Sequence, residues 1–67
     1  MNRELLKEEM DKQNLSMADL ARLAEVDRST IYRILNGDQK CTVKVAAKIT
    51  NGMKLKPKLA TQIFFDE

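Results

Sequence analysis

Histidine and tryptophan are absent from this chain of 67 residues, and cysteine and proline each occur once. Because Cys41 has no partner cysteine and no histidine is present, the sequence excludes both an internal disulfide and an ordinary zinc site. A single free thiol is typical of a reducing compartment. The chain also lacks an apolar run long enough to span a bilayer and a signal-peptide pattern. We therefore expect a cytoplasmic protein that binds no membrane, metal or cofactor.

The residues that catalysis requires are missing as well. No serine or cysteine has a histidine to activate it, and no glycine-rich loop is present to hold a phosphate. The adjacent acids Glu8 and Glu9 lie in a helical pattern, and Asp66 and Glu67 lie in the tail. Such pairs are typical of solvated surface. We predict that the protein is not an enzyme.

Glycine occurs only twice and aromatic residues make up 4% of the chain, whereas leucine, alanine, lysine and glutamate are frequent. This composition favours an all-α fold, and the length fits a single domain over residues 1–67. Hydrophobic periodicity and capping residues predict five helices. Their approximate ranges are 3–13, 17–24, 28–36, 43–51 and 57–65.

Local signals mark the ends of these helices. Ser16 and Asp19 form an [ST]-x-x-[DE] capping pattern, and Asp27 and Thr42 are candidate N-caps. Gly37 and the Asn51-Gly52 pair are read as helix ends, and Asn2 and Pro57 as helix starts. The residues expected to face inward are Leu20, Leu23 and Ala24 in the second helix, Val45, Ala46 and Ile49 in the fourth, and Leu59, Ala60 and Ile63 in the fifth.

Charge is distributed unevenly along the chain. Residues 1–27 carry four basic and seven acidic side chains, whereas residues 28–58 carry eight basic side chains and one acidic side chain. The net charges of the two segments are −3 and +7. A strongly basic half is typical of proteins that bind a polyanion, although lysines also keep a helical surface soluble. Charge alone leaves both interpretations open.

The third predicted helix divides into two faces. At about 100° per residue, its polar side chains share one arc and its aliphatic side chains share the other. The polar arc holds Arg28, Ser29, Tyr32, Arg33 and Asn36, and the opposite arc holds Ile31, Ile34 and Leu35. An arginine offers two donors that match the two acceptors of guanine in the major groove. The pattern predicts a helix that reads base edges through Arg28, Ser29, Tyr32 and Arg33.

The stretch from Leu15 to Gly37 resembles the helix-turn-helix of the lambda-repressor-like family, which includes phage repressors, Cro proteins and small bacterial regulators. The matching positions are Leu20, Ala21, Ala24, Val26, Ile31, Ile34, Asn36 and Gly37. Two positions depart from the family pattern. Glu25 stands where the family usually has a glycine in the turn, so it must tolerate a positive φ. At the first residue of the second helix, Met17 replaces a glutamine whose side chain often binds a phosphate in this family. Only a backbone contact is therefore expected there.

The resemblance implies a compact five-helix lambda-repressor-like domain with its helix-turn-helix at about residues 16–36. It also implies phosphate contacts at the start of the second helix and after the third. The candidate phosphate-binding residues are Ser16, Met17, Asn36, Lys40, Thr42 and Lys44. Such contacts would position the protein without reading sequence.

The function that the resemblance implies is that of a Cro-like repressor from a phage or mobile element, acting on the bacterial nucleoid. A single helix reads few base pairs, so we expect a homodimer on a palindromic DNA operator. The candidate dimer surface is Leu59, Ile63, Phe64 and Phe65, unless these residues complete the monomer core. The alternative function is a protein-interaction module, such as an antirepressor or antitoxin, that uses the acidic first helix and the acidic tail.

Overall fold

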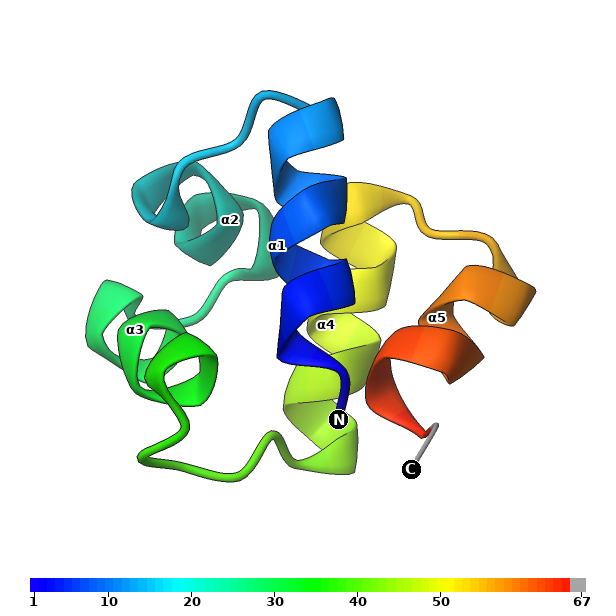
Figure 1. The fold of residues 1–67 in the computed structure, drawn as a ribbon. Coiled ribbons are helices and arrows are strands. Elements are labelled where there is room, and N and C mark those ends of the chain that lie inside the picture. Colours follow the sequence, from blue (N-terminus) through cyan, green and yellow to red (C-terminus); the bar gives the residue numbers. More distant parts are fainter. Residues whose placement is uncertain (66–67) are drawn as a thin grey trace.

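The computed structural model describes residues 1–65, so the acidic tail residues Asp66 and Glu67 lie outside the described part. Within that part the chain forms five α-helices and no strand, which confirms the all-α fold class. The helices are α1 (Arg3–Lys12), α2 (Met17–Ala24), α3 (Arg28–Asn36), α4 (Val43–Met53) and α5 (Pro57–Phe64). Figure 1 shows α3 and α5 on opposite sides of the molecule, with α1 and α4 between them.

Most of the predicted caps are confirmed. The side chains of Asn2 and Thr42 accept hydrogen bonds from the backbone amides of the residues three positions later, at 3.0 and 3.2 Å. Ser16 and Asp19 form a reciprocal capping box, in which Asp19 Oδ2 accepts from the Ser16 amide and Ser16 Oγ accepts from the Asp19 amide. Pro57 is the first residue of α5. These contacts satisfy amides that a helix cannot pair internally, and so fix where each helix begins.

Two of the predicted helix signals are wrong in part. Asp27 occupies the N-cap position of α3, but its side chain makes no capping bond. Its backbone carbonyl accepts from the Thr30 and Ile31 amides instead. Gly52 does not end α4, which continues to Met53 and is capped by Lys54 at a φ of 56°. A glycine near the end of an apolar pattern resembles a C-cap signal, but here it lies within the helix.

The core draws on every helix. The fully buried large side chains are Leu6, Leu20, Ile31, Ile34, Ile49 and Ile63. Helix α2 packs against both α3 and α4, while α1 packs against α5. At the chain start, the Asn2 amide donates to the Ile63 carbonyl at 2.6 Å and so joins the two ends. The aliphatic back of α3 is thereby fixed in the core, which holds its other face outward.

The structure corrects three of the expected inward or interface positions. Leu23 is 43% exposed, whereas Ala21, a matching position of the helix-turn-helix pattern, is buried. Ile63 and Phe64 are buried in the monomer, so neither is free to form a dimer surface. Leu59 packs partly against the core, and Phe65 remains 61% exposed.

Gly52 lies where α4 meets the end of α2. A Cβ added at this position would stand 2.8 Å from the carbonyl oxygen of Leu23 and 2.9 Å from its carbonyl carbon. Both neighbours are backbone atoms, which cannot rotate away as a side chain can. The absence of a side chain at Gly52 therefore permits the close approach of the two helices.

Candidate nucleic-acid interface

The turn between α2 and α3 has the left-handed residue that the sequence predicts. Glu25 has a φ of 57° and a ψ of 45°, and its backbone amide bonds back to the last turn of α2. The following amide, that of Val26, donates to the Ala21 carbonyl at 3.0 Å. Paired bonds of this kind close a helix and redirect the chain sharply. The turn sets the angle at which α3 leaves α2.

The two faces of α3 are confirmed by their burial. Ile31, Ile34 and Leu35 are buried, whereas Arg28, Ser29, Tyr32, Arg33 and Asn36 are exposed. Tyr32 is 53% exposed. Among residues 1–65, the ion pair within 4 Å joins Arg22 to Asp19, so no carboxylate binds Arg28 or Arg33 there. The two guanidinium groups are thus held on a rigid helix with their donors facing solvent.

A groove of about 690 Å³ runs between the amino-terminal ends of α2 and α3. It is lined by Ser16, Met17, Ala18, Asp27, Arg28, Ser29 and Tyr32. Because the first amides of an α-helix have no internal partner, two helix starts direct unpaired N–H groups toward this groove. The two helix starts and Arg28 favour an anionic group in this groove, while the carboxylate of Asp27 in the same lining opposes one.

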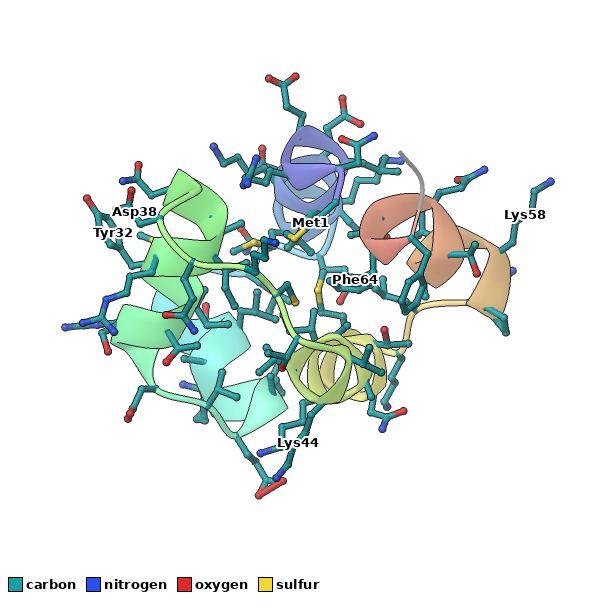
Figure 2. The ribbon with its side chains drawn as sticks, turned by 90° about the horizontal axis from the view of Figure 1, so that it is seen from below. Met1, Tyr32, Asp38, Lys44, Lys58 and Phe64 are labelled. Atoms are coloured by element: carbon teal, nitrogen blue, oxygen red, sulfur yellow. The ribbon has the colours of Figure 1, made fainter. Side chains whose placement is uncertain are left out.

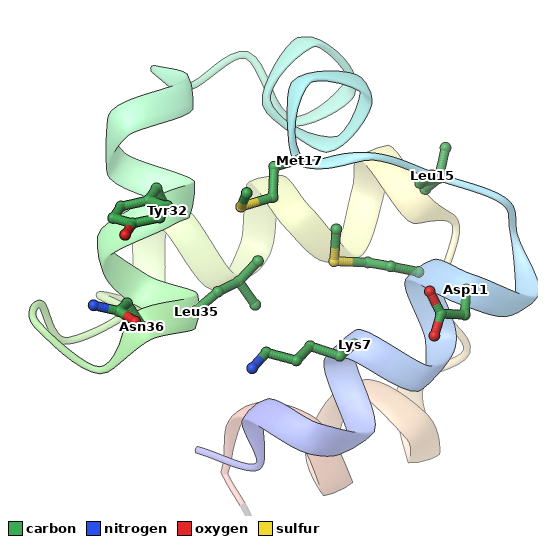
Figure 3. Close-up of a pocket in the computed structure, with 8 residues that line it drawn as sticks. Lys7, Asp11, Leu15, Met17, Tyr32, Leu35 and Asn36 are labelled. Atoms are coloured by element: carbon green, nitrogen blue, oxygen red, sulfur yellow. The ribbon is translucent and has the colours of Figure 1, made fainter.

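A second groove of about 430 Å³ adjoins the first. Figure 3 shows Lys7 and Asp11 of α1 on one side of it, with Tyr32 and Asn36 of α3 on the other. Met17 and Tyr32 line both grooves and so form the ridge between them. The sequence analysis did not assign Lys7 to the recognition side, because only the packing of α1 beside α3 brings it there.

The start of α2 offers backbone and not side-chain contacts. Ser16 Oγ already accepts from the Asp19 amide, and the Ser16 amide donates to Asp19 Oδ2. Bonds from the backbone and side chain of Ser16, and the neighbouring Arg22, hold the pKa of Asp19 below its ordinary value. The amide of Met17, one residue inside the helix, remains available to a phosphate oxygen. The structure thus places Ser16 and Met17 at the groove, with Met17 the freer of the two.

The candidate phosphate contacts after α3 follow the chain around the end of that helix. Asn36 Nδ2 donates to Asp38 Oδ2 at 3.0 Å, so a carboxylate lies beside this amide. Lys40, Thr42 and Lys44 are exposed along the connection to α4 and in its first turn. In Figure 2, Tyr32 and Lys44 project outward from α3 and α4, and Lys58 projects on the side opposite Tyr32.

Arg3 has a role in supporting α3 that the sequence analysis missed. Its Nε donates to the Ile34 carbonyl at 3.1 Å, across 31 positions of sequence. The same guanidinium group lies 3.5 Å from the place where a Cβ of Gly37 would stand. A cation near the last carbonyls of a helix opposes the partial negative charge there. Arg3 therefore ties α1 to the carboxyl-terminal end of α3.

We expect Arg3→Met to lower stability by about 1 kcal/mol, because the part-buried Ile34 carbonyl loses its charged donor while the apolar stem is kept. In a domain of this size that corresponds to a fall of roughly 4–8 °C in the melting temperature. Lys7→Met on the exposed face of α1 is the matched control. Equal melting temperatures for the two variants would show that the bond contributes nothing.

Cys41 lies half-buried between α3 and α4, at the edge of the candidate phosphate-binding segment. Burial raises the pKa of its thiol, and the nearby amino-terminal charge opposes this only in part. A raised pKa leaves less of the thiolate, which is the reactive form of a cysteine.

A solvent-facing polar arc on the second helix of a tight helix-turn-helix is typical of DNA-binding proteins. A family model described as Helix-turn-helix matches residues 6–59, from α1 into α5. The chain belongs to this family, the Cro/C1-type helix-turn-helix proteins with the lambda-repressor-like fold, which confirms the predicted resemblance. The family is one of DNA-binding regulators and not of enzymes. No curated protein and no solved structure gave a significant match. Over residues 1–65, no helix is both long and apolar enough to cross a membrane.

Proposed function

We propose that this helix-turn-helix regulator is a Cro-like repressor that binds a specific operator by inserting α3 into the major groove. The observation that supports it best is the division of α3 into a buried aliphatic face and a free polar face. A helix fixed in this way holds its side chains in register with base edges. The family suggests an origin in a phage or mobile element.

In this proposal Arg28 and Arg33 read guanines, and Ser29 and Tyr32 complete the base contacts. Each arginine is free of carboxylate partners among the described residues, so no ion pair has to break on binding. Tyr32 sits on the ridge between the two grooves, where its ring can contact a thymine methyl group.

The phosphate contacts in this proposal flank α3 on both sides. At the start of α2, the Met17 amide binds a DNA phosphate, with Ser16 beside it. On the other side of α3, Lys40, Thr42 and Lys44 bind phosphates. Asn36 contributes least, because the carboxylate of Asp38 on its amide repels a phosphate.

A single α3 reads a short site, so we propose that two copies bind a palindromic operator with half-sites about one helical turn apart. Of the four dimer candidates, burial in the monomer leaves Leu59 and Phe65 with free surface. The competing function, an antirepressor or antitoxin of the same fold, predicts a protein partner and no DNA binding of its own.

A gel shift with random double-stranded DNA separates these functions. The +7 segment should give nonspecific binding at low salt that weakens steeply as salt rises. We expect Lys44→Ala to reduce the slope of log binding constant against log salt by about one unit, since one phosphate contact is lost. Lys58→Ala, which removes the same charge on the side opposite Tyr32, should change the slope far less. Absence of any shift at low salt would favour the protein partner.

A further inference from the structure

Asp27 carries a free carboxylate at the start of α3. The polar side chains in three other N-cap positions, those of Asn2, Ser16 and Thr42, each accept from the amide three residues later. At α3 the corresponding amide, that of Thr30, donates at 3.0 Å to the backbone carbonyl of Asp27 itself. The backbone thus holds the start of the helix, and the Asp27 side chain makes no capping bond and, within residues 1–65, no ion pair.

This carboxylate lies on the side of the molecule proposed to face DNA. Asp27 is exposed and lines the groove between the starts of α2 and α3, together with Arg28 and Ser29. The amino-terminal residues of a recognition helix are those that contact base edges. In the proposed complex Asp27 therefore approaches the major groove beside Arg28. A carboxylate there is repelled by the phosphates, which is unfavourable unless a donor on the DNA offsets it.

The major-groove edges of the four bases differ in what they offer a carboxylate. Guanine presents two acceptors, and thymine presents an acceptor and a methyl group, so neither can donate to it. Adenine has an amino donor, but its N7 acceptor lies next to that donor and repels a negative charge. Cytosine presents its N4 amino group without a neighbouring acceptor. A carboxylate in this position therefore selects cytosine.

We infer that Asp27 is a specificity-determining residue, whose carboxylate accepts a hydrogen bond from the N4 amino group of a cytosine in each half-site. The inference rests on the proposed function and adds a reading residue to the polar arc of α3. The helical pattern did not select Asp27, because this residue precedes the first turn and its residue type is typical of a cap.

The negative charge gives Asp27 opposite effects on two kinds of DNA. On random DNA the carboxylate meets few correctly placed donors, so repulsion by the phosphates dominates and binding is weakened. On the operator the bond to cytosine offsets that repulsion. Arg28 differs, since its positive charge attracts phosphates whatever the sequence. Asp27 thus increases specificity mainly by disfavouring the wrong sites.

Asp27→Asn tests this inference, because it removes the charge while keeping the shape and the ability to cap a helix. Binding of random double-stranded DNA should strengthen at least about twofold at low salt, since one repulsive charge is lost. The ratio of operator to random binding should fall at least about fivefold. Selection from a random pool should lose cytosine at one base pair per half-site and accept adenine there, whose edge matches an amide.

Asp38→Asn is the matched control, since it removes an exposed carboxylate from the segment after α3. It should strengthen binding to all sequences alike and return the wild-type site. Thermal melting followed by circular dichroism checks that both variants keep the fold.

The inference is overturned if Asp27→Asn returns the wild-type site with an unchanged ratio, which is the result expected of a residue that only caps α3. It is also overturned if Asp38→Asn relaxes the same base pair. Either result leaves the proposed function standing, because the wild-type protein still selects a site. Failure of the proposed function is distinct, since the wild-type protein then binds no random DNA and selects no site.

Discussion

Gly52→Ala is expected to destabilise the protein by roughly 2–3 kcal/mol, although alanine is the better helix former. Helix propensity alone would favour alanine by about 1 kcal/mol. The new Cβ, however, would stand 2.8 Å from the Leu23 carbonyl oxygen, so α2 and α4 must move apart. Overpacking of a core typically costs about 1–3 kcal/mol and occasionally more, and backbone neighbours place this site at the upper end.

That loss is large for a chain of this length. At roughly 0.05–0.15 kcal/mol per residue, 67 residues provide a total stability on the order of 3–10 kcal/mol. A fall of at least about 10 °C in the melting temperature is expected, measured by circular dichroism. Asn51→Ala, at the exposed neighbouring position of α4, is the matched control and should be neutral or slightly stabilising. A Gly52→Ala variant that melts with the wild type would show that α2 and α4 are not in close contact.

The second glycine provides a useful contrast. Gly37 has a φ of 86°, and a Cβ there would meet the Arg3 guanidinium group at 3.5 Å, an ordinary contact distance. Its requirement for glycine is therefore conformational and amounts to about 1 kcal/mol. The sequence predicts this one, because a glycine directly after a helix is a C-cap signal that depends on neighbours in the chain alone.

What the sequence predicts correctly is set by such local contacts. The capping box of Ser16 and Asp19 and the cap at Thr42 each involve residues within about one helical turn, whereas the left-handed conformation of Glu25 was expected from the family resemblance. Side chains three residues apart meet wherever the helix forms, so the pattern needs no knowledge of the fold. The two faces of α3 follow from helical periodicity in the same way.

The features that the sequence does not predict depend on tertiary packing. Arg3 bonds to Ile34, and Gln13 Nε2 donates to the Met53 carbonyl at 3.1 Å, across 40 positions of sequence. No pattern in the chain marks either pair. Leu23 fits the apolar stripe of α2, yet its side chain is 43% exposed. Propensity and periodicity set which helices form, and packing decides which of their faces are covered.

For the candidate site, the exposure of the polar arc of α3 was predictable from the sequence. The contribution of α1 to the neighbouring groove was not. Lys7 reaches the groove beside Tyr32 only because α1 packs near α3 (Figure 3). The bond from Asn36 to Asp38 likewise changes the expectation for Asn36, since an amide facing a carboxylate is a poor phosphate contact. The roles of individual residues on DNA remain predictions that substitution must test.

Arg28→Ala and Arg33→Ala are expected to give the largest losses in operator binding. Each bidentate contact to a guanine is worth about 1–3 kcal/mol of discrimination. On a palindromic operator a dimer makes every contact twice, so one substitution removes roughly 2–6 kcal/mol, or about a 30-fold to more than a 1000-fold loss in affinity. The loss should be specific to sequence, because the lysines and helix starts that hold phosphates are unchanged.

The measurement begins with selection of bound sites from a random pool of double-stranded DNA, first with the wild-type protein. Repeating the selection with Arg28→Ala or Arg33→Ala should give a site that has lost its preference at one base pair per half-site and keeps the others. Lys40→Ala, which removes a positive charge from the segment after α3, should return the wild-type sequence with uniformly weaker binding. If the arginine variants select the wild-type site with undiminished affinity, Arg28 and Arg33 do not read the bases.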